Sequence, residues 1–499
     1  MHSKVLCYYI AFKSVVLKSY QTNTLTFFTL PGKKQSFKEA KASKLAKIDG
    51  FKRSLPFMTA TALAAVVDKI KQEGLPPVGN RKVFTAAALA GLQDKGYGQV
   101  ITTMKVHCKD GSSRDLYMAN PLALLQAAYS QGGSYYNLVQ ATLQKHPSNL
   151  NKCWDAIFYM DEVQGGNPLG VHQNRKCWVL YFSFAQFGPV VLQKEKSWLT
   201  LLVERTVKVQ ELHAGVSQIF TAVMKQFFLH PGWDVGSGLL LKGPPNGINA
   251  RLHIQLGAVL QDGGAHKAVF HAKGDSGTRM CFLCTNLVAD RSRLVDGENQ
   301  LTCKLLSRSQ LCMANDNDIK NTIAKIKRNS AEMSVEHFKL YQQATGFNFE
   351  PFGLLFCAEL EHHIFPASQY VHDWMHTLVA NGVFHTVFTA WLEAANGHLD
   401  IYKELEKYFD LWVHPVSRKL QHLFSPKRKS SNKEAGVFKC DASEALSLAP
   451  ILCFYIQKTF LPANVLPAEC NVPGQILDNF AARYMFFVFA DILELSFSL

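Results

Sequence analysis

The sequence has 499 residues, of which 47% are hydrophobic, and a formal net charge of +14 at pH 7. A chain of this length and apolar content forms two or three globular units and is not disordered throughout. The positive excess is typical of a protein that binds a polyanion, although a generically basic surface would also produce it.

The cysteines and the apolar stretches exclude two further classes of protein. The twelve cysteines are scattered, and only Cys281 and Cys284 are closely paired, unlike a secreted disulfide framework. No stretch reaches the roughly 18 uninterrupted apolar residues of a membrane span. The apolar N-terminus is interrupted by Lys13 and has no clear small-residue cleavage site, so we expect no signal peptide.

Residues 1–55 are predicted to form a basic, poorly structured arm. Residues 33–53 hold eight Lys or Arg and two acidic residues, and are either a solvated helix face or a segment that contacts phosphates. The candidate DNA contacts are Lys33, Lys34, Lys38 and Lys41. Residues 56–150 are predicted to be mainly helical, with DNA binding as one possible role.

After residue 150 the pattern changes to strands. Segments 156–161, 177–188 and 198–209 are predicted strands, and 213–230 is a predicted helix. A hairpin-like insertion around the turn "GPPNG" precedes a strand that ends at Asp262. A ribonuclease-H-like core has this order, with the fourth strand beside the first. The expected fold class is therefore mixed α/β, with residues 151–265 as a β-rich core.

Two acidic residues end neighbouring strands in this arrangement. Asp161 closes the first strand and Asp262 closes the fourth. Carboxylates held close together repel each other unless a cation lies between them, and Mg²⁺ or Mn²⁺ prefers such oxygen ligands. Two such ions can activate a water or a 3′-hydroxyl and stabilise the leaving oxygen of a phosphodiester. Ordinary strand-end acids are the alternative interpretation.

Cys281 and Cys284 form a Cys-x-x-Cys motif within an insertion predicted over residues 266–365. As thiolates they can bind one Zn²⁺, but a complete site needs two more ligands. The candidates are His266, His271, Cys303, Cys312, His372 and His376, with His376 and Cys303 preferred. A chance pair is the alternative, and a thioredoxin-like motif is disfavoured because no βαβ pattern surrounds the cysteines.

A helix is predicted from Trp374 onward, within a core-completing segment at 366–420. On a continuous helix Asp373 and His376 would lie on the side of the apolar stripe, while Glu393 would lie about 120° away. A polar pair that faces the core needs a partner, a metal or a catalytic role. Asp373 as a helix N-cap and His376 as a hydrogen-bonded core histidine are the alternatives.

Three sequence blocks together resemble CACTA-type cut-and-paste DNA transposases. The blocks are "YMDEVQGGNPLG", "VLQDGGAHKAVFHAKGDSGTRMCFLC" and "HDWMHTLVANGVFH", and they span roughly residues 150–400. The resemblance implies a ribonuclease-H-like DDE/D core with a zinc-binding insertion. By position it makes Asp161 and Asp262 the first two metal-binding acids, Cys281 and Cys284 zinc ligands, and Asp373 and His376 the Asp-x-Met-His pair.

The sequence departs from that family at one position. The family often has Glu two residues after the histidine, where this chain has Leu378. The third acid is therefore Asp373 or Glu393. The helix-face argument favours Asp373, whereas a kink at residues 381–382 would favour Glu393.

Two functions follow from the resemblance, and one competes with it. The first is a DNA transposase, or its descendant, that cleaves and transfers strands with Mg²⁺. The second is a catalytically inactive, zinc-containing nucleic-acid-binding descendant. An unrelated enzyme using Asp161 and Glu162 as acid and base is the weakest, because adjacent strand residues point to opposite faces.

The expected partners are DNA and, as an open possibility, a second copy of the chain, with no membrane. Residues 421–440 are predicted to be a basic linker, usable for nuclear import, before a helical C-terminal region at 441–499. The expected location is the nucleus, with the cytoplasm as the alternative.

Overall fold

The computed structural model describes most of the chain from residue 96 to residue 460. The described ranges are 96–164, 176–234, 237–289, 301–302, 310–373, 375–379, 382–396, 400–412 and 420–460. The four N-terminal lysines, Cys303 and the helices predicted before residue 96 lie outside these ranges. None of the helices within these ranges is long and apolar enough to cross a membrane.

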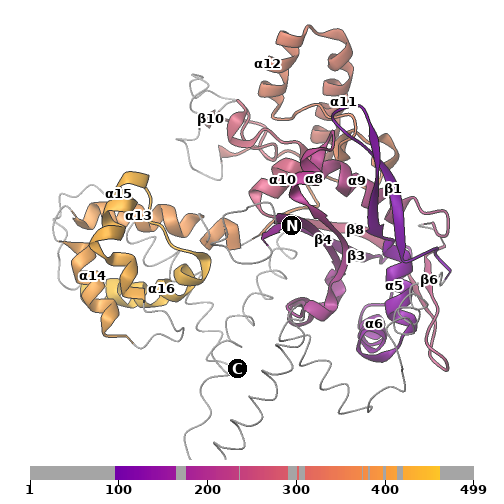
Figure 1. Cartoon of the computed structure of the whole chain (residues 1–499), viewed down its shortest axis with the longest axis horizontal. Coiled ribbons are helices and arrows are strands. Elements are labelled where there is room, and N and C mark those ends of the chain that lie inside the picture. The colour runs from indigo at the N-terminus through magenta and orange to yellow at the C-terminus, as the bar shows by residue number, and fades with distance from the viewer. Residues whose placement is uncertain are drawn as a thin grey trace, which may run out of the picture. The chain divides into compact units, whose positions relative to one another are not determined.

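A mixed five-stranded sheet forms the centre of the fold (Figure 1). Its spatial order is β11-β8-β3-β4-β5. β4 runs antiparallel to both β3 and β5, whereas β3, β8 and β11 run parallel to one another. The expected order of three antiparallel strands with a fourth beside the first is confirmed. The strands are β3 (Trp154–Gln164), β4 (Lys176–Phe184), β5 (Leu199–Arg205), β8 (Ile254–Gln261) and β11 (Tyr370–His372).

Alternation along β3 gives the sheet two distinct faces. Phe158 and Met160 are fully buried, and the Phe158 ring packs against Phe220 and Phe227 of helix α9 (Gly215–Phe228). Tyr159 and Asp161 point to the opposite face, because successive strand residues alternate. Asp161 is therefore delivered to the face of the sheet that does not carry α9.

A bulge in β8 sets which residues share that face. Ala156 pairs with Leu256, but Ile157 pairs with Ala258, so Gly257 is an extra residue in the ladder. A Cβ atom on Gly257 would lie 2.3 Å from Cβ of Asp155, so only glycine fits here. Side chains alternate between the two faces along a strand. Without the extra residue, Asp262 would share the face of Leu256, which is the face that carries α9. With it, Asp262 faces the same side as Asp161.

Strand β11 was not predicted from the sequence, and the helix predicted from Trp374 is interrupted. Residues Met375–Val379 form one π-helical turn, and helix α13 begins only at Val383 and runs to Asn396. Gly382 stands at this break, and a Cβ atom there would clash with the carbonyl oxygen of Thr377, so the local backbone requires glycine.

The described part of the region predicted to be helical before residue 150 contains a hairpin as well as helices. Strands β1 and β2 pair antiparallel, and they are followed by α5 and α6. Leu116, Tyr129 and Val139 are buried in the same hydrophobic core as the sheet, so these elements belong to it. The bounds are β1 (Ile101–His107), β2 (Ser113–Ala119), α5 (Pro121–Ser130) and α6 (Gly133–Lys145).

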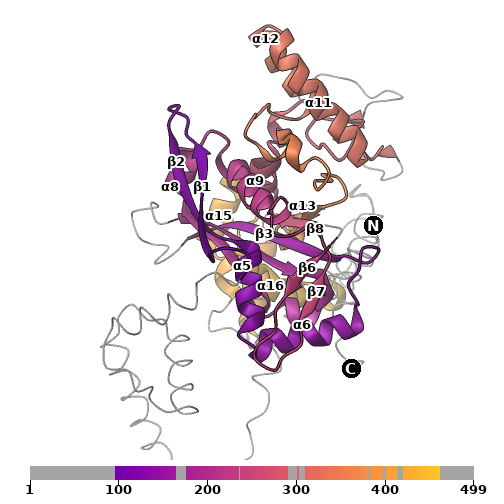
Figure 2. The same cartoon turned by 90° about the vertical axis from the view of Figure 1, so that its right-hand side faces the viewer.

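The chain between β8 and β11 is mainly helical. Helix α10 (Gly263–Phe270) follows β8 directly, and α11 (Asp316–Glu332) and α12 (Val335–Thr345) form a helical hairpin (Figure 2). The described part also includes the short parallel pair β9 (Leu287–Val288) and β10 (Leu301–Thr302). Elsewhere, α8 (Thr206–Gln210) follows β5, and β6 (Leu239–Leu241) pairs with β7 (Ala250–Leu252).

The residues after Asp373 form a second hydrophobic core. Its helices are α13, α14 (Ile401–Asp410), α15 (Pro426–Ala435) and α16 (Ala442–Tyr455), followed by a π-helical turn at Ile456–Phe460. Helix α15 occupies the place of the predicted basic linker. Lys429 of α15 pairs with Asp400 over 2.7 Å, and Asn432 is buried.

Candidate functional site

Three aspartates lie at the same level across three neighbouring parallel strands, Asp161 within β3 and Asp262 and Asp373 directly after β8 and β11. Tyr159 pairs with Leu260, so Asp161, two residues further on, is level with Asp262. His372 pairs with Gln261, so Asp373 is also level with Asp262. Neighbouring strands lie about 4.8 Å apart. Residues far apart in the sequence thus form one acidic row across the sheet.

The electrostatics of Tyr159 and Asp161 agree with this row. Burial raises the pKa of the Tyr159 phenol, and the charges of Asp161, Asp373 and Asp262 raise it further. Burial also raises the pKa of Asp161, and the Asp262 charge adds to that effect, while the Tyr159 hydroxyl and His376 oppose it. The three carboxylates are therefore close enough to one hydroxyl for their charges to act on it together.

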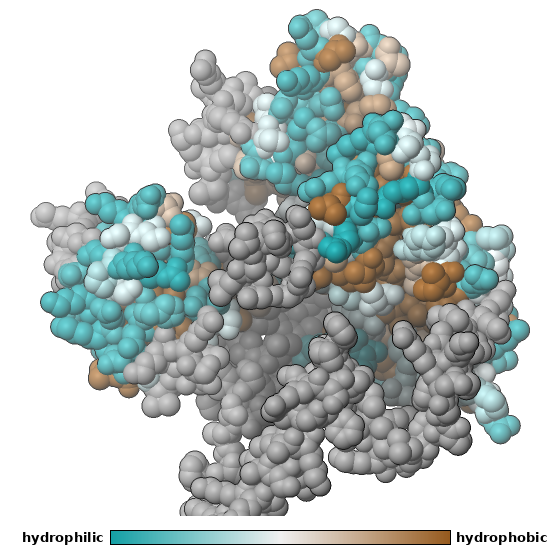
Figure 3. Space-filling view, in the orientation of Figure 1, coloured by the Kyte–Doolittle hydropathy of each residue, from teal (hydrophilic) through white to brown (hydrophobic). Residues whose placement is uncertain are grey.

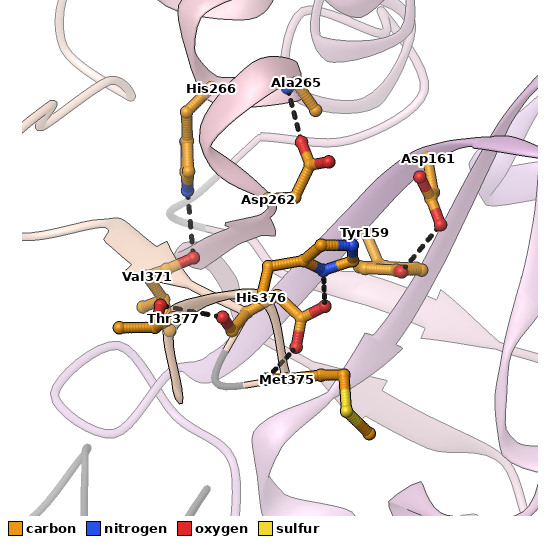
Figure 4. A network of polar contacts seen from close by, with 10 residues as sticks. Tyr159, Asp161, Asp262, Ala265, His266, Val371, Met375, His376 and Thr377 are labelled. Carbon is orange, nitrogen blue, oxygen red and sulfur yellow. Dashed lines mark hydrogen bonds and ion pairs between the residues drawn. The ribbon is translucent and has the colours of Figure 1, made fainter. Parts of the chain in front are cut away.

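Each carboxylate is held by a local hydrogen bond. Tyr159 donates to Oδ2 of Asp161 over 3.1 Å, and the backbone amide of Ala265 donates to Oδ1 of Asp262 over 2.6 Å as the N-cap of α10. Figure 4 shows both aspartates together with His376.

Asp373 has two partners within the turn that follows it. Its Oδ1 accepts from the amide of Met375 over 2.9 Å, and its Oδ2 lies 2.7 Å from Nδ1 of His376. Asp373 thus caps the π-helical turn, as the N-cap interpretation expected, and also belongs to the acidic row.

Glu162, the neighbour of Asp161, serves a different purpose. Burial alone would raise the pKa of Glu162, but hydrogen bonds from Lys176 and Thr206 outweigh it and hold the pKa below its usual range. The two donors lie 2.9 and 2.7 Å from the carboxylate. Glu162 is therefore a structural ion-pair partner, and the idea that it shares acid–base work with Asp161 has no support.

The structure places the two candidate third acids differently. Asp373 stands in the acidic row, whereas Glu393 is exposed on α13 and acts electrostatically on Tyr402 in the second core. The prediction that His376 faces the core is wrong, because its side chain is 43% exposed. That prediction assumed a continuous helix from Trp374, and the break before Val383 removes its basis.

Cys281 and Cys284 form a close thiol pair in which one sulfur is activated. The Cys284 thiol donates a hydrogen bond to the sulfur of Cys281. This hydrogen bond, with backbone amides and the Arg279 charge, lowers the pKa of Cys281 to about 6 against the effect of burial. The same hydrogen bond, with burial, raises the pKa of Cys284. Thiolates are the form in which cysteines bind metals.

Cys312 is the described thiol that comes near this pair. The amide of Thr285 donates to the carbonyl of Cys312 over 2.8 Å, and the Cys312 charge acts on Cys284. His376 is held by Asp373 and does not join the two cysteines. Among the described residues, no three His, Cys, Asp or Glu side chains stand together as a metal-binding group.

Sequence reasoning did not name Tyr159 and named His372 only as a candidate zinc ligand, not as a neighbour of the acids. Tyr159 lies on the same face as Asp161, so period-two alternation would have found it. His372 acts electrostatically with Asp262 and Asp373, but only strand β11 puts it there, and three residues carry too little pattern to predict a strand. Comparison with known proteins adds no assignment: no protein-family model and no curated protein matches this sequence.

Proposed function

We propose that this chain is a relative of CACTA-type transposases whose ribonuclease-H-like core cleaves and transfers DNA strands with the help of divalent ions. The observation that carries the proposal is the acidic row of Asp161, Asp262 and Asp373 on parallel strands. The net charge of +14 supports DNA as the partner. A DNA substrate would place the protein in the nucleus, with the cytoplasm as the alternative.

The donor set of the acidic row fits Mg²⁺ or Mn²⁺. Three carboxylates offer hard oxygen ligands. Burial, with a smaller contribution from the Asp262 charge, raises the pKa of Asp161, so a bound cation would favour its ionised form. A bound divalent ion would activate the attacking water or hydroxyl and neutralise charge on the phosphate. The side chains would first have to turn toward one another, because no three stand as a metal-binding group in the described residues.

The chain's own residues orient this site. Tyr159 fixes one oxygen of Asp161, and its raised pKa keeps the phenol protonated as a donor. The start of α10 fixes Asp262 through the Ala265 amide. His376 fixes Asp373 through Nδ1, and a protonated His376 would offset part of the acidic charge.

A second candidate function is a catalytically inactive, nucleic-acid-binding descendant. The observation in its favour is that each of the three carboxylates is already engaged by a protein donor. The proposed structural zinc ion at Cys281 and Cys284 belongs to both functions. Cys312 is its nearest described third ligand, and Cys303 is a further candidate.

A plasmid-nicking assay tests the proposal. The purified full chain is incubated with supercoiled plasmid and Mg²⁺ or Mn²⁺, beside Asp161→Asn, Asp262→Asn and the matched control Glu393→Gln. We expect nicking by the wild type and by Glu393→Gln, and none by the two aspartate variants. Nicking that survives Asp161→Asn would refute the acidic row as its source. DNA binding without nicking in the wild type would select the inactive descendant.

A further inference from the structure

A cavity of about 230 Å³ lies between helix α11 and the segment 354–366, which leads into β11. None of its lining residues belongs to the acidic row, so it is a separate feature of the fold. The lining is mainly apolar, and it includes the buried side chains of Ile323, Leu354, Phe356 and Ile364. The surface over α11 and α12 is mainly hydrophilic (Figure 3), so the apolar lining is a local property of this cavity.

Hydrogen bonds outside the cavity hold its two walls in place. Asp316, the first residue of α11, accepts from the backbone amides of Ala367 and Ser368 over 2.7 and 3.1 Å. At the other end of the segment, the amide of Leu354 donates to the hydroxyl of Ser217 on α9 over 2.8 Å. Each wall is thus attached to the rest of the fold, and the cavity exists without a ligand.

The charged residues of the lining give the cavity a positive side. Lys320 and Lys327 lie two turns apart on α11, with Ile323 between them on the same face of the helix. The Lys320 ammonium donates to the backbone carbonyl of Glu361 over 2.7 Å and lies 4.3 Å from the centroid of the Phe365 ring. Lys327 is exposed and forms no ion pair with any residue that the structure describes. Two lysines and one glutamate, Glu361, leave the lining with a net charge of +1.

The volume and the charge limit the ligand to a small monoanion. An apolar cavity of about 150 Å³ holds one benzene molecule, so a volume of about 230 Å³ holds roughly nine or ten non-hydrogen atoms. Nucleotides and drug-sized compounds need about 300 Å³ or more. A net charge of +1 matches a carboxylate better than a phosphate monoester, which carries about −1.5 to −2 at neutral pH.

We propose that this cavity binds a small carboxylic acid with an apolar body, such as a medium-chain fatty acid. The apolar body packs against Ile323, Leu354 and Phe356, and the carboxylate pairs with Lys327 at the exposed side. Removal of the apolar body from water supplies most of the affinity, and the lysine selects for the negative charge. The site goes beyond the proposed DNA reaction and does not depend on it.

Cys357 lines the cavity and reports on its occupancy. Its half-buried thiol donates a hydrogen bond to Oε2 of Glu359 over 3.7 Å, and Lys225 of α9 pairs with the same carboxylate. A ligand in the cavity covers this thiol and slows its alkylation. Cys153 is also half-buried but does not line the cavity, so it serves as the internal control.

The test measures the rate at which iodoacetamide alkylates Cys357 in the full chain, followed by mass spectrometry with octanoate or octylamine present. Octanoate at about twice its dissociation constant should slow this reaction about threefold, because only the unoccupied protein reacts. The rate at Cys153 should not change. Octylamine, which has the same chain and a positive head group, should protect neither thiol. Absence of protection by octanoate would overturn the site, and equal protection by octylamine would overturn the recognition of a carboxylate.

Three variants of α11 locate the ligand. Lys327→Gln and Lys325→Gln each remove an exposed lysine, but only Lys327 lines the cavity. The octanoate concentration that gives half-maximal protection should rise about two- to fivefold in Lys327→Gln, as expected for an exposed ion pair, and stay unchanged in Lys325→Gln. Equal values for the two variants would overturn the role of Lys327. Ala324→Phe fills the cavity from an exposed position of its lining, and continued protection of Cys357 in this variant, with an unchanged melting temperature, would show that octanoate binds elsewhere.

Discussion

Tyr159 donates its phenolic hydrogen to Asp161, two residues further along the same face of β3, over 3.1 Å. The Tyr159 ring stacks on Tyr181 of β4, with centroids 6.3 Å apart, and meets Trp198 edge-on. Aromatic packing thus fixes the position of the donor, and the donor fixes the carboxylate. This arrangement predicts that Tyr159 orients Asp161 without itself reacting.

Tyr159→Phe should reduce metal-dependent nicking while leaving the fold intact. The substitution keeps the ring and removes a hydrogen bond worth about 0.5–1.5 kcal/mol, so the nicking rate should fall about two- to tenfold. The control is Tyr181→Phe, because the Tyr181 hydroxyl makes no hydrogen bond in the described part of the chain. Equal nicking rates for the two variants would contradict the orienting role.

Asp373→Asn and Glu393→Gln should differ sharply in nicking. Asp373 belongs to the acidic row, whereas Glu393 is exposed on α13. We expect a loss of about 100-fold or more for Asp373→Asn, since even residues that only orient metal ligands contribute about 10–100-fold. Glu393→Gln should retain full activity. The opposite ranking would show that the third acid has been misassigned.

Asp161→Asn should stabilise the protein at neutral pH. Burial, with the Asp262 charge, raises the pKa of Asp161 in the folded state, so its ionisation opposes folding. The contribution of the protonated Asp161 carboxyl to the stability of the fold is complete below the pKa that this carboxyl has in the unfolded chain. It is lost as the pH rises through the raised pKa of the same carboxyl in the folded protein. The melting temperature of Asp161→Asn should therefore exceed that of the wild type at pH 7, and by less at pH 3. A variant less stable than the wild type at pH 7 would contradict this account.

Alkylation of the metal-free protein should distinguish Cys281 from Cys284 by the pH at which each thiol reacts. The pKa of Cys281 is about 6, so its reaction with iodoacetamide should reach half its maximal rate near pH 6. Cys284 should react only at much higher pH, because its pKa is raised. In Cys284→Ala the thiol donor is lost, and the profile of Cys281 should move upward. If zinc is bound, both thiols should be protected until a chelator is added.

Gly257→Ala should destabilise the sheet more than a neighbouring glycine substitution. The added Cβ would lie 2.3 Å from Cβ of Asp155, and forcing such a contact costs about 1–3 kcal/mol. Gly264→Ala is the control, because its Cβ would lie 3.5 Å from Oδ1 of Asp262, an ordinary contact. The free energies of unfolding of both variants, measured with denaturant, provide the comparison. Equal values would show that the bulge accommodates the added methyl group without loss of stability.

The long strands could be predicted from the sequence because composition and alternation agree in them. β3, β4 and α9 lie where their patterns place them, and Asp161 and Asp262 are level on adjacent strands as the strand order required. The bulge at Gly257 could not be foreseen, since it depends on the close approach of a neighbouring strand. The helix-face argument favoured Asp373 over Glu393, and Asp373 is the residue that lies in the acidic row. The argument assumed a continuous helix from Trp374, however, and the helix is interrupted before Val383.

Other features depended on contacts between distant segments. Strand β11 is only three residues long and is defined by its pairing with β8. Helix α15 has few apolar residues, so its composition is that of a linker, and burial of Asn432 with the Lys429–Asp400 pair anchors it. Sequence periodicity carries no information about such partners.

The position of β11 also determines when the acidic row can exist. Asp262 and Asp373 are level on adjacent strands, yet the whole insertion, residues 263–372, separates them along the chain. During synthesis the ribosome releases Asp161 and Asp262 before Asp373, because a chain is made from its N-terminus. Any nascent chain or truncated product that ends before residue 373 has only two of the three acids. If the proposed strand cleavage depends on all three acids, unfinished copies of the chain would lack it because of the order in which the strands are made.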